Sequence, residues 1–247
     1  MRTIAFAALL VATTAPLTAT AGEFAVSPIR LELSGALRTA ALTVRNDDTT
    51  PLSFQITGMT WTQDDKAVDQ YQNATDLIYF PRLLTLEPGR EGVIRVGVRP
   101  GVWATEKTYR LFVEELASAL KPSTGGPQVR VLVRFGAPVF VKPAQPLLDL
   151  QVSGIETSAG AVAWTVRNAG NEHELFRDMQ VRGFDANAAL IFSHQVAARY
   201  LLAGSARQFS VPLEPGQCDR IARISVEVAT EKSQARGGVS PESAPCR

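Results

Sequence analysis

Histidine, cysteine and unbalanced charge are all scarce in this chain of 247 residues. The only histidines are His173 and His194, the only cysteines are Cys218 and Cys246, and their positions match no zinc-site spacing. The formal net charge of +1 gives no sign of a nucleic-acid partner. After residue 21 no apolar run approaches the roughly 18 residues that a membrane-spanning helix needs, so we expect no membrane insertion.

Catalytic motifs are missing as well. The chain has no G-x-S-x-G elbow, no H-E-x-x-H pair and no phosphate-binding loop. His173 stands in the polar run Asn-Glu-His-Glu without a further ligand at a metal-binding spacing, and we expect both histidines to be exposed or strand-face side chains. Asp64, Asp65 and Asp69 lie in a polar stretch, residues 62–76, that we interpret as a solvated loop. The sequence therefore predicts no enzyme, no metal and no cofactor.

The first 21 residues have the pattern of a secretory signal peptide. Arg2 supplies the positive charge, residues 4–12 form the apolar run, and Ala-Thr-Ala at 19–21 is a cleavage site. The alternative, a buried helix or a membrane anchor, fits less well because the run is too short to span a bilayer. We expect export and cleavage. Export permits a disulfide between Cys218 and Cys246, with two free thiols as the alternative.

Short runs rich in β-branched residues recur through the first half of the chain and predict seven strands separated by turns. This profile is typical of an immunoglobulin-like sandwich, although the cysteine pair of antibody domains is absent. Pro28 marks an edge or a switch point within the first strand. The predicted strands are residues 24–33, 40–46, 51–61, 77–81, 91–99, 109–116 and 127–143.

The second half repeats the profile, and no segment has the periodicity of an amphipathic helix. Leu-Thr-Val-Arg-Asn at 42–46 resembles Trp-Thr-Val-Arg-Asn at 164–168, and Leu-Glu-Pro-Gly occurs at both 86–89 and 213–216. We therefore expect two domains of one type, residues 22–143 and 144–247, with a polar, loosely held tail from residue 229. The predicted strands of the second half are residues 147–152, 161–168, 179–184, 199–202, 208–213 and 220–228.

The stretch 127–143 lies between the two halves and alternates between apolar and basic residues. We expect Gly136 and Pro138 to break this strand, because proline is tolerated mainly at a sheet edge or a bulge. An edge strand of this kind offers unpaired backbone groups to another chain. One face would carry Val129, Val131, Val133 and Phe135, and the other Arg130, Leu132 and Arg134.

Basic residues stand on several predicted strands. Arg30 follows Pro28, Arg95 and Arg99 share one strand face, and Arg134 shares another with Arg130. Each is interpreted either as part of a solvated strand face or as an anchor for a carboxylate, with which a guanidinium pairs in a bidentate manner.

These segments together resemble the periplasmic pilus chaperones, the PapD-like family of the chaperone–usher pathway. The resemblance is carried in order by residues 25–33, 42–47, 80–89, 93–96, 109–116 and the stretch that ends at Lys142-Pro143. It covers the first half and is weak in the second. The loop at 117–127 is short, and Pro-Val-Phe-Val at 138–141 is similar to the branch that assembles archaic and spore-coat-type pili.

The resemblance implies a periplasmic chaperone of two immunoglobulin-like domains set at an angle. Such a chaperone lends an edge strand to an incomplete pilin subunit until an outer-membrane usher exchanges it. The lent side chains would be Val129, Val131 and Val133 with Phe135.

Two basic residues of the family hold the carboxylate at the subunit's C-terminus. Arg30 matches the first, but Pro138 stands where the family has lysine, so Arg134 is our replacement and Arg95 the runner-up. Lys142 and Pro143 match the domain junction.

The competing interpretation is a periplasmic two-domain sandwich that binds or supports other molecules without chaperone activity. It needs neither an open strand edge nor a carboxylate anchor. The sequence leaves open which pilin subunits and which usher are the partners, and whether the free protein caps itself as a dimer.

Overall fold

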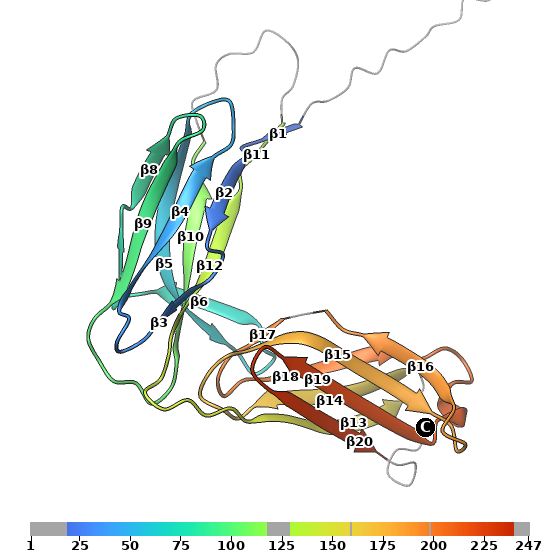
Figure 1. Cartoon of the computed structure of the whole chain (residues 1–247). Helices are drawn as coiled ribbons and strands as arrows, with labels where there is room; N and C mark the ends of the chain where they lie inside the picture. Colours follow the sequence, from blue (N-terminus) through green and yellow to red (C-terminus); the bar gives the residue numbers. More distant parts are fainter. Residues whose placement is uncertain (1–18, 118–128, 159, 198, 240–247) are drawn as a thin grey trace, which may run out of the picture.

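Two β-sandwich domains meet at an angle near the middle of the chain (Figure 1). The computed structural model describes residues 19–117, 129–158, 160–197 and 199–239. In this part of the chain the only helix is a single 3-10 turn, η1 (Cys218–Arg220), and no described helix is long and apolar enough to cross a bilayer. The predicted all-β fold with two immunoglobulin-like sandwiches is confirmed.

The N-terminal domain packs two sheets around a core that includes Phe54, Ile94 and Leu111. The first sheet contains, in spatial order, β3 (Leu31–Leu33), β12 (Arg134–Val141), β10 (Lys107–Glu115), β5 (Leu52–Gln63) and β6 (Asp69–Asn73), with β8 (Leu83–Leu86) also paired to β5. The second sheet contains β2 (Phe24–Ser27), β4 (Thr39–Asn46), β9 (Glu91–Val98) and β7 (Leu77–Phe80).

The first predicted strand, residues 24–33, is divided between these two sheets. β2 pairs with β4, whereas β3 pairs in parallel with β12. Pro28 lies between the two strands, where the chain passes from one sheet to the other. The predicted switch at Pro28 is confirmed, and it brings the next basic residue, Arg30, against the C-terminal domain.

The stretch 127–143 contains two strands instead of one. β11 (Val129–Val131) pairs in parallel with β1 (Ala19–Ala21), and β12 begins only at Arg134. Between the two strands, the N–H of Val133 donates to the Glu115 carboxylate over 3.5 Å. The Glu115 N–H in turn donates to the Val133 carbonyl over 3.0 Å, so the end of β10 holds this interruption through both its backbone and a side chain.

The expected break at Gly136 and Pro138 is wrong, because β12 runs through both residues. β3 joins β12 only from Val139 onward, so β10 is the only described strand beside Pro138. A proline without an N–H is tolerated there because one side of the strand has no ladder to complete.

The C-terminal domain repeats the sandwich around a core that includes Trp164, Phe176 and Val226. One sheet contains β13 (Leu150–Ser158), β14 (Ala161–Asn168) and β18 (Ala206–Pro212). The other contains β16 (Leu190–Gln195), β15 (Glu174–Phe184), β19 (Arg223–Thr230) and β20 (Gln234–Val239), with β17 (Tyr200–Leu201) paired to β15. Residues 142–149 link the two domains.

The internal repeat in the sequence has a structural counterpart. Asn46 and Asn168 end β4 and β14 and are completely buried. The amide of Asn46 donates to the Leu86 carbonyl over 2.9 Å, and the amide of Asn168 donates to the Leu201 carbonyl over 3.1 Å. The same residue type therefore ties the end of the equivalent strand to a neighbouring segment in each domain.

Two segments expected to be irregular contain strands. The polar stretch 62–76 holds the end of β5 and all of β6, while Asp64 accepts the Val68 N–H in the turn between them. That hydrogen bond lowers the pKa of Asp64. In the predicted tail, β20 pairs with β19, and Gly237 lies so close to Val152 that a Cβ would meet it at 2.7 Å. Packing against β13 holds this strand, although its own sequence has little apolar pattern.

Candidate functional site

Apolar side chains are exposed along β11 and the residues that join it to β12; we call this stretch the edge of β11 and β12. Val131 is 48% exposed and Leu132 is 46% exposed, while Val133 is half-buried. Phe135 is half-buried and packs against the core of its own domain. Val129 and Arg130 belong to β11. Within the described residues, β1 is the only strand partner of β11, and β10 is the only partner of β12 before Val139.

The first predicted anchor, Arg30, bridges the two domains. Its Nη1 lies 2.8 Å from Oε2 of Glu231 in the C-terminal domain, and its Nε lies 3.3 Å from Oε1 of Glu32. Lys142 of the junction continues the network, with Nζ 2.8 Å from the other Glu32 oxygen. A chain of four alternating charges therefore crosses the junction.

These contacts stabilise the charged forms of the groups. The hydrogen bond to Glu231 raises the pKa of Arg30, against the opposing effect of burial, and the same bond lowers the pKa of Glu231. The hydrogen bond from Lys142 lowers the pKa of Glu32 and raises that of Lys142. Interaction with Tyr200 of the C-terminal domain also raises the pKa of Arg30, by less than the hydrogen bond to Glu231 does.

The other two predicted anchors lie apart from this network. Arg134 forms an ion pair with Glu114 at 3.2 Å, and its guanidinium carbon is 3.8 Å from the Phe112 ring centroid. Arg95 lies on β9 of the other sheet, in a groove lined only by residues of the N-terminal domain, among them Ile78 and Phe80. The structure therefore brings neither of them beside Arg30.

Arg110, which the sequence analysis did not single out, lies on the Tyr200 side of the junction. Its guanidinium carbon is 3.8 Å from the Trp61 ring centroid and 5.8 Å from the Tyr200 ring centroid. Its Nη1 donates to the Gly136 carbonyl over 3.1 Å, and its buried Nε has no hydrogen-bond partner. Among the described residues no carboxylate forms an ion pair with it, in contrast to Arg30, Arg134 and Lys142.

Only strand register connects Arg110 with the expected anchor position. In the pairing of β10 with β12, Arg110 is directly opposite Pro138, the residue that stands where the resemblance implies lysine. A basic group from the neighbouring strand therefore reaches the region that proline leaves without charge. Tyr200 interacts with both arginines: the guanidinium carbon of Arg110 is 5.8 Å from its ring centroid, and interaction with Tyr200 contributes to the raised pKa of Arg30.

His173 is buried at the junction, so the expectation of an exposed or strand-face side chain is wrong for it. Its Nδ1 lies 2.8 Å from Oε2 of Glu106, and that same oxygen accepts the His173 backbone N–H over 2.8 Å. Phe140 stacks on the imidazole with ring centroids 3.5 Å apart. A polar residue becomes buried here because the partner that satisfies it comes from the other domain. His194 stands half-buried on β16.

Side chains and backbone groups also lock the junction from other directions. The Asn171 amide donates to the carbonyls of Ala104 and Gln145 over 2.8 and 2.9 Å, and Gln63 donates to the Tyr200 carbonyl over 3.1 Å. Pro143 is buried beside Lys142. These bonds join the two sandwiches at a defined angle (Figure 1).

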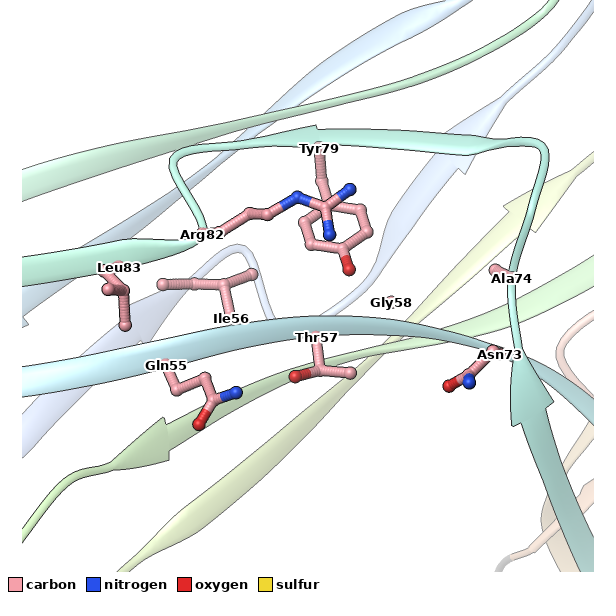
Figure 2. A pocket seen from close by; sticks show the side chains of 9 residues that line it. All are labelled: Gln55, Ile56, Thr57, Gly58, Asn73, Ala74, Tyr79, Arg82 and Leu83. Atoms are coloured by element: carbon pink, nitrogen blue, oxygen red, sulfur yellow. The ribbon is translucent and has the colours of Figure 1, made fainter.

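Other parts of the surface offer less chemistry. A cavity of about 440 Å³ lies where the chain crosses from β7 to β8, and Figure 2 shows Arg82 alongside Tyr79 above Ile56 of β5. In the described part of the chain no group of three or more metal-ligating side chains lies together. Cys218 in η1 packs against the C-terminal core, and Cys246 lies outside the described residues, so their disulfide stays a prediction.

Residues 23–146 match the family model described as the pili and flagellar-assembly chaperone, PapD N-terminal domain. No curated protein sequence matches the chain.

Solved structures are similar over both domains. One chain of the CsuC–CsuE chaperone–tip adhesion subunit pre-assembly complex, from the archaic chaperone-usher Csu pili of Acinetobacter baumannii, is 17% identical, with 91% of this chain and 100% of that chain covered and a TM-score of 0.58. The E. coli chaperone DraB is 16% identical over 90% of this chain and 98% of its own, with a TM-score of 0.56. A chain of the complex of the Salmonella enterica SafA pilin with the SafB chaperone is 14% identical over 92% and 99%, with a TM-score of 0.55.

Proposed function

The chain belongs to the family of pilus-assembly chaperones typified by PapD, and on that premise we propose that it lends the edge of β11 and β12 to an incomplete pilin subunit and holds the subunit's C-terminal carboxylate at the domain junction. Its role in pilus assembly is that of a chaperone, a non-enzymatic class. The observation that carries the proposal is the combination of an exposed apolar edge with two basic residues at the domain junction, Arg30 beside Glu231 and Arg110 beside Trp61 and Tyr200.

The apolar edge supplies both backbone and side-chain contacts. A subunit that lacks a strand has unpaired N–H and C=O groups beside apolar pockets, and a donated strand satisfies both. The exposure of Val131 and Leu132 leaves apolar area for such a contact. Each valine buried in this way contributes roughly 1.5–3 kcal/mol before the cost of ordering the chains is subtracted. Val129 and Val133 are the neighbouring donors that we expect, whereas the packing of Phe135 against its own core makes it the weakest of the four.

Export would open this edge. β1 consists of residues 19–21, the last three of the segment that we expect to be cleaved as a signal peptide. Its removal leaves β11 without a strand partner among the described residues. The mature chain would then work in the periplasm, with pilin subunits as its partners and an outer-membrane usher as the recipient. A self-capped dimer through the same edge is the form that we would look for in the absence of subunits.

The carboxylate anchor that the contacts favour is Arg30 with Arg110. Arg134 already pairs with Glu114, and Arg95 belongs to the opposite sheet, so both rank below Arg110 as the second anchor. Arg110 has the chemistry of an anion site because it is partly buried, stacked on Trp61 and without a described carboxylate partner.

Co-expression with candidate pilin subunits in the periplasm tests the function. We expect a subunit that degrades or aggregates alone to be recovered as a soluble one-to-one complex with the tagged chain. A subunit that stays equally soluble without the chain, with no complex recovered, would favour the alternative of a structural module without chaperone activity.

Alanine at Arg110 will weaken that complex far more than alanine at either of the other second-anchor candidates. A hydrogen bond to a charged group is worth about 1.5–3 kcal/mol, so the dissociation constant will rise about tenfold to a hundredfold. Titration of the purified subunit measures this change. Arg95→Ala, on the opposite sheet, is the charge-matched control with less than about a twofold effect, and Arg134→Ala should cost less than Arg110→Ala. A larger loss from Arg134→Ala than from Arg110→Ala would return the anchor role to Arg134.

A further inference from the structure

Glu231 occupies the position at Arg30 that an incoming carboxylate needs. Glu231 lies in the turn between β19 and β20, and its Oε2 is 2.8 Å from Nη1 of Arg30. The other described acid at this guanidinium is Glu32, whose Oε1 is 3.3 Å from Nε. A carboxylate binds a guanidinium best through two N–H groups. Nη1 and Nε of Arg30 are already engaged, so a subunit's terminal carboxylate has to compete for at least one of them.

The turn that carries Glu231 is held in place without help from Arg30. The Glu231 backbone N–H donates to the Leu175 carbonyl over 3.1 Å. The hydroxyl oxygen of Thr230 accepts the N–H groups of Lys232 and Ser233 over 3.1 and 2.8 Å. The turn therefore holds the Glu231 carboxylate beside Arg30 through hydrogen bonds that do not involve Arg30.

The contact is nevertheless open enough to be exchanged. The side chains of Arg30 and Glu231 are 29% and 26% exposed, so water and a ligand can reach both partners. Exposed ion pairs contribute little net stability, which makes replacement of one carboxylate by another nearly balanced. A second cation is available to the displaced group, because Nη2 of Arg177 lies 3.9 Å from Oε1 of Glu231.

We propose that Glu231 is a built-in competitor for the carboxylate site of Arg30. It fills the site in the free chain and moves toward Arg177 when the terminal carboxylate of a subunit binds to Arg30. By competing it weakens subunit binding and so favours release of the subunit at the next step of assembly. The inference rests on the proposed function, since it assigns regulation to the same site.

A purely structural role for Glu231 predicts a change of opposite sign. If the Arg30–Glu231 pair only braced the two domains in a productive angle, its loss would weaken subunit binding. Competition instead predicts that its loss strengthens binding. The sign of the change therefore separates the two roles.

The test uses the pilin subunit that copurifies with the chain and a peptide of that subunit's last twelve or so residues, with either a free C-terminal carboxylate or a C-terminal amide. Glu231→Gln preserves the size of the side chain and removes its charge. We expect it to lower the dissociation constant for the free-carboxylate peptide about fivefold, the scale of an exposed ion pair. We also expect it to slow dissociation of the whole subunit and to leave binding of the amidated peptide unchanged.

Two controls make the result specific. Glu227→Gln makes the same charge change on β19, where Glu227 pairs with Arg182 at 3.3 Å, and should leave the dissociation constant unchanged. In an Arg30→Ala chain, Glu231→Gln should have no effect, because the competition has lost its target. Equal melting temperatures of the variants would show that folding is unaffected.

Unchanged or weaker binding by Glu231→Gln would overturn the competitor role. If the unaltered chain binds the subunit and its carboxylate peptide but does not respond to Glu231→Gln, this inference alone fails. If the unaltered chain binds neither, the proposed function fails with it.

Discussion

Replacing Val131 with aspartate will abolish the complex with a pilin subunit while the chain itself stays folded. Val131 is 48% exposed at the end of β11, so the new carboxylate is hydrated in the free chain. In the complex it would enter an apolar groove. Losing a buried valine costs roughly 1.5–3 kcal/mol, and burying an unpaired charge costs several kcal/mol more. We therefore expect binding to weaken by more than about a thousandfold.

The measurement is the amount of subunit that copurifies with the tagged chain from periplasmic extracts. Val93→Asp is the matched control, because Val93 is 49% exposed on β9 in the opposite sheet. It should leave the complex at the level of the unaltered chain, and both variants should melt at similar temperatures. Recovery of a normal complex with Val131→Asp would remove β11 from the binding surface.

Replacing Phe140 with alanine will cause the largest loss of stability at the domain junction. Phe140 is fully buried, stacks on His173, and lies 5.9 Å from Trp61 between ring centroids. Truncating a buried phenylalanine typically costs about 3–5 kcal/mol, because apolar contacts are lost and a cavity remains. The cavity here would lie beside the buried His173–Glu106 pair, and water entering it would compete with the hydrogen bonds that join the domains.

Chemical denaturation at neutral pH measures this free energy of unfolding. Phe80→Ala removes the same ring from a position that is 73% exposed, and it should change the stability by less than about 0.5 kcal/mol. A loss below about 1 kcal/mol for Phe140→Ala would mean that the two domains do not depend on this packing for their stability.

Strands with one buried face could be predicted from the sequence because their pattern is local. Leu42 and Val44 are completely buried and alternate with smaller or polar neighbours that are less buried, and Val162, Trp164 and Val166 do the same in the second domain. The repeated asparagine at the end of these strands indicated two domains of one type, and Asn46 and Asn168 make equivalent hydrogen bonds. Each of these features depends on a few consecutive residues.

Features that depend on contacts between distant segments could not be predicted from the sequence. Gly136 and Pro138 indicate a break by themselves, yet β12 continues because β3 joins it only after Pro138. His173 stands in a polar run that is typical of exposed residues, but it is buried because Glu106 of the other domain forms a hydrogen bond with its ring. Arg110 lacks any motif, and only the register of β10 against β12 sets it opposite Pro138.

The sequence alone determined the family, the two β-sandwiches and the apolar strand edge, because alternation and turn residues act over short distances along the chain. The tertiary structure decided which charged groups meet at the junction. Arg30 and Glu231 are separated by 201 positions and form an ion pair only because two independently patterned domains dock at one angle. The ion pairs at the junction follow from the way the two domains dock, and no local pattern in the chain encodes that docking.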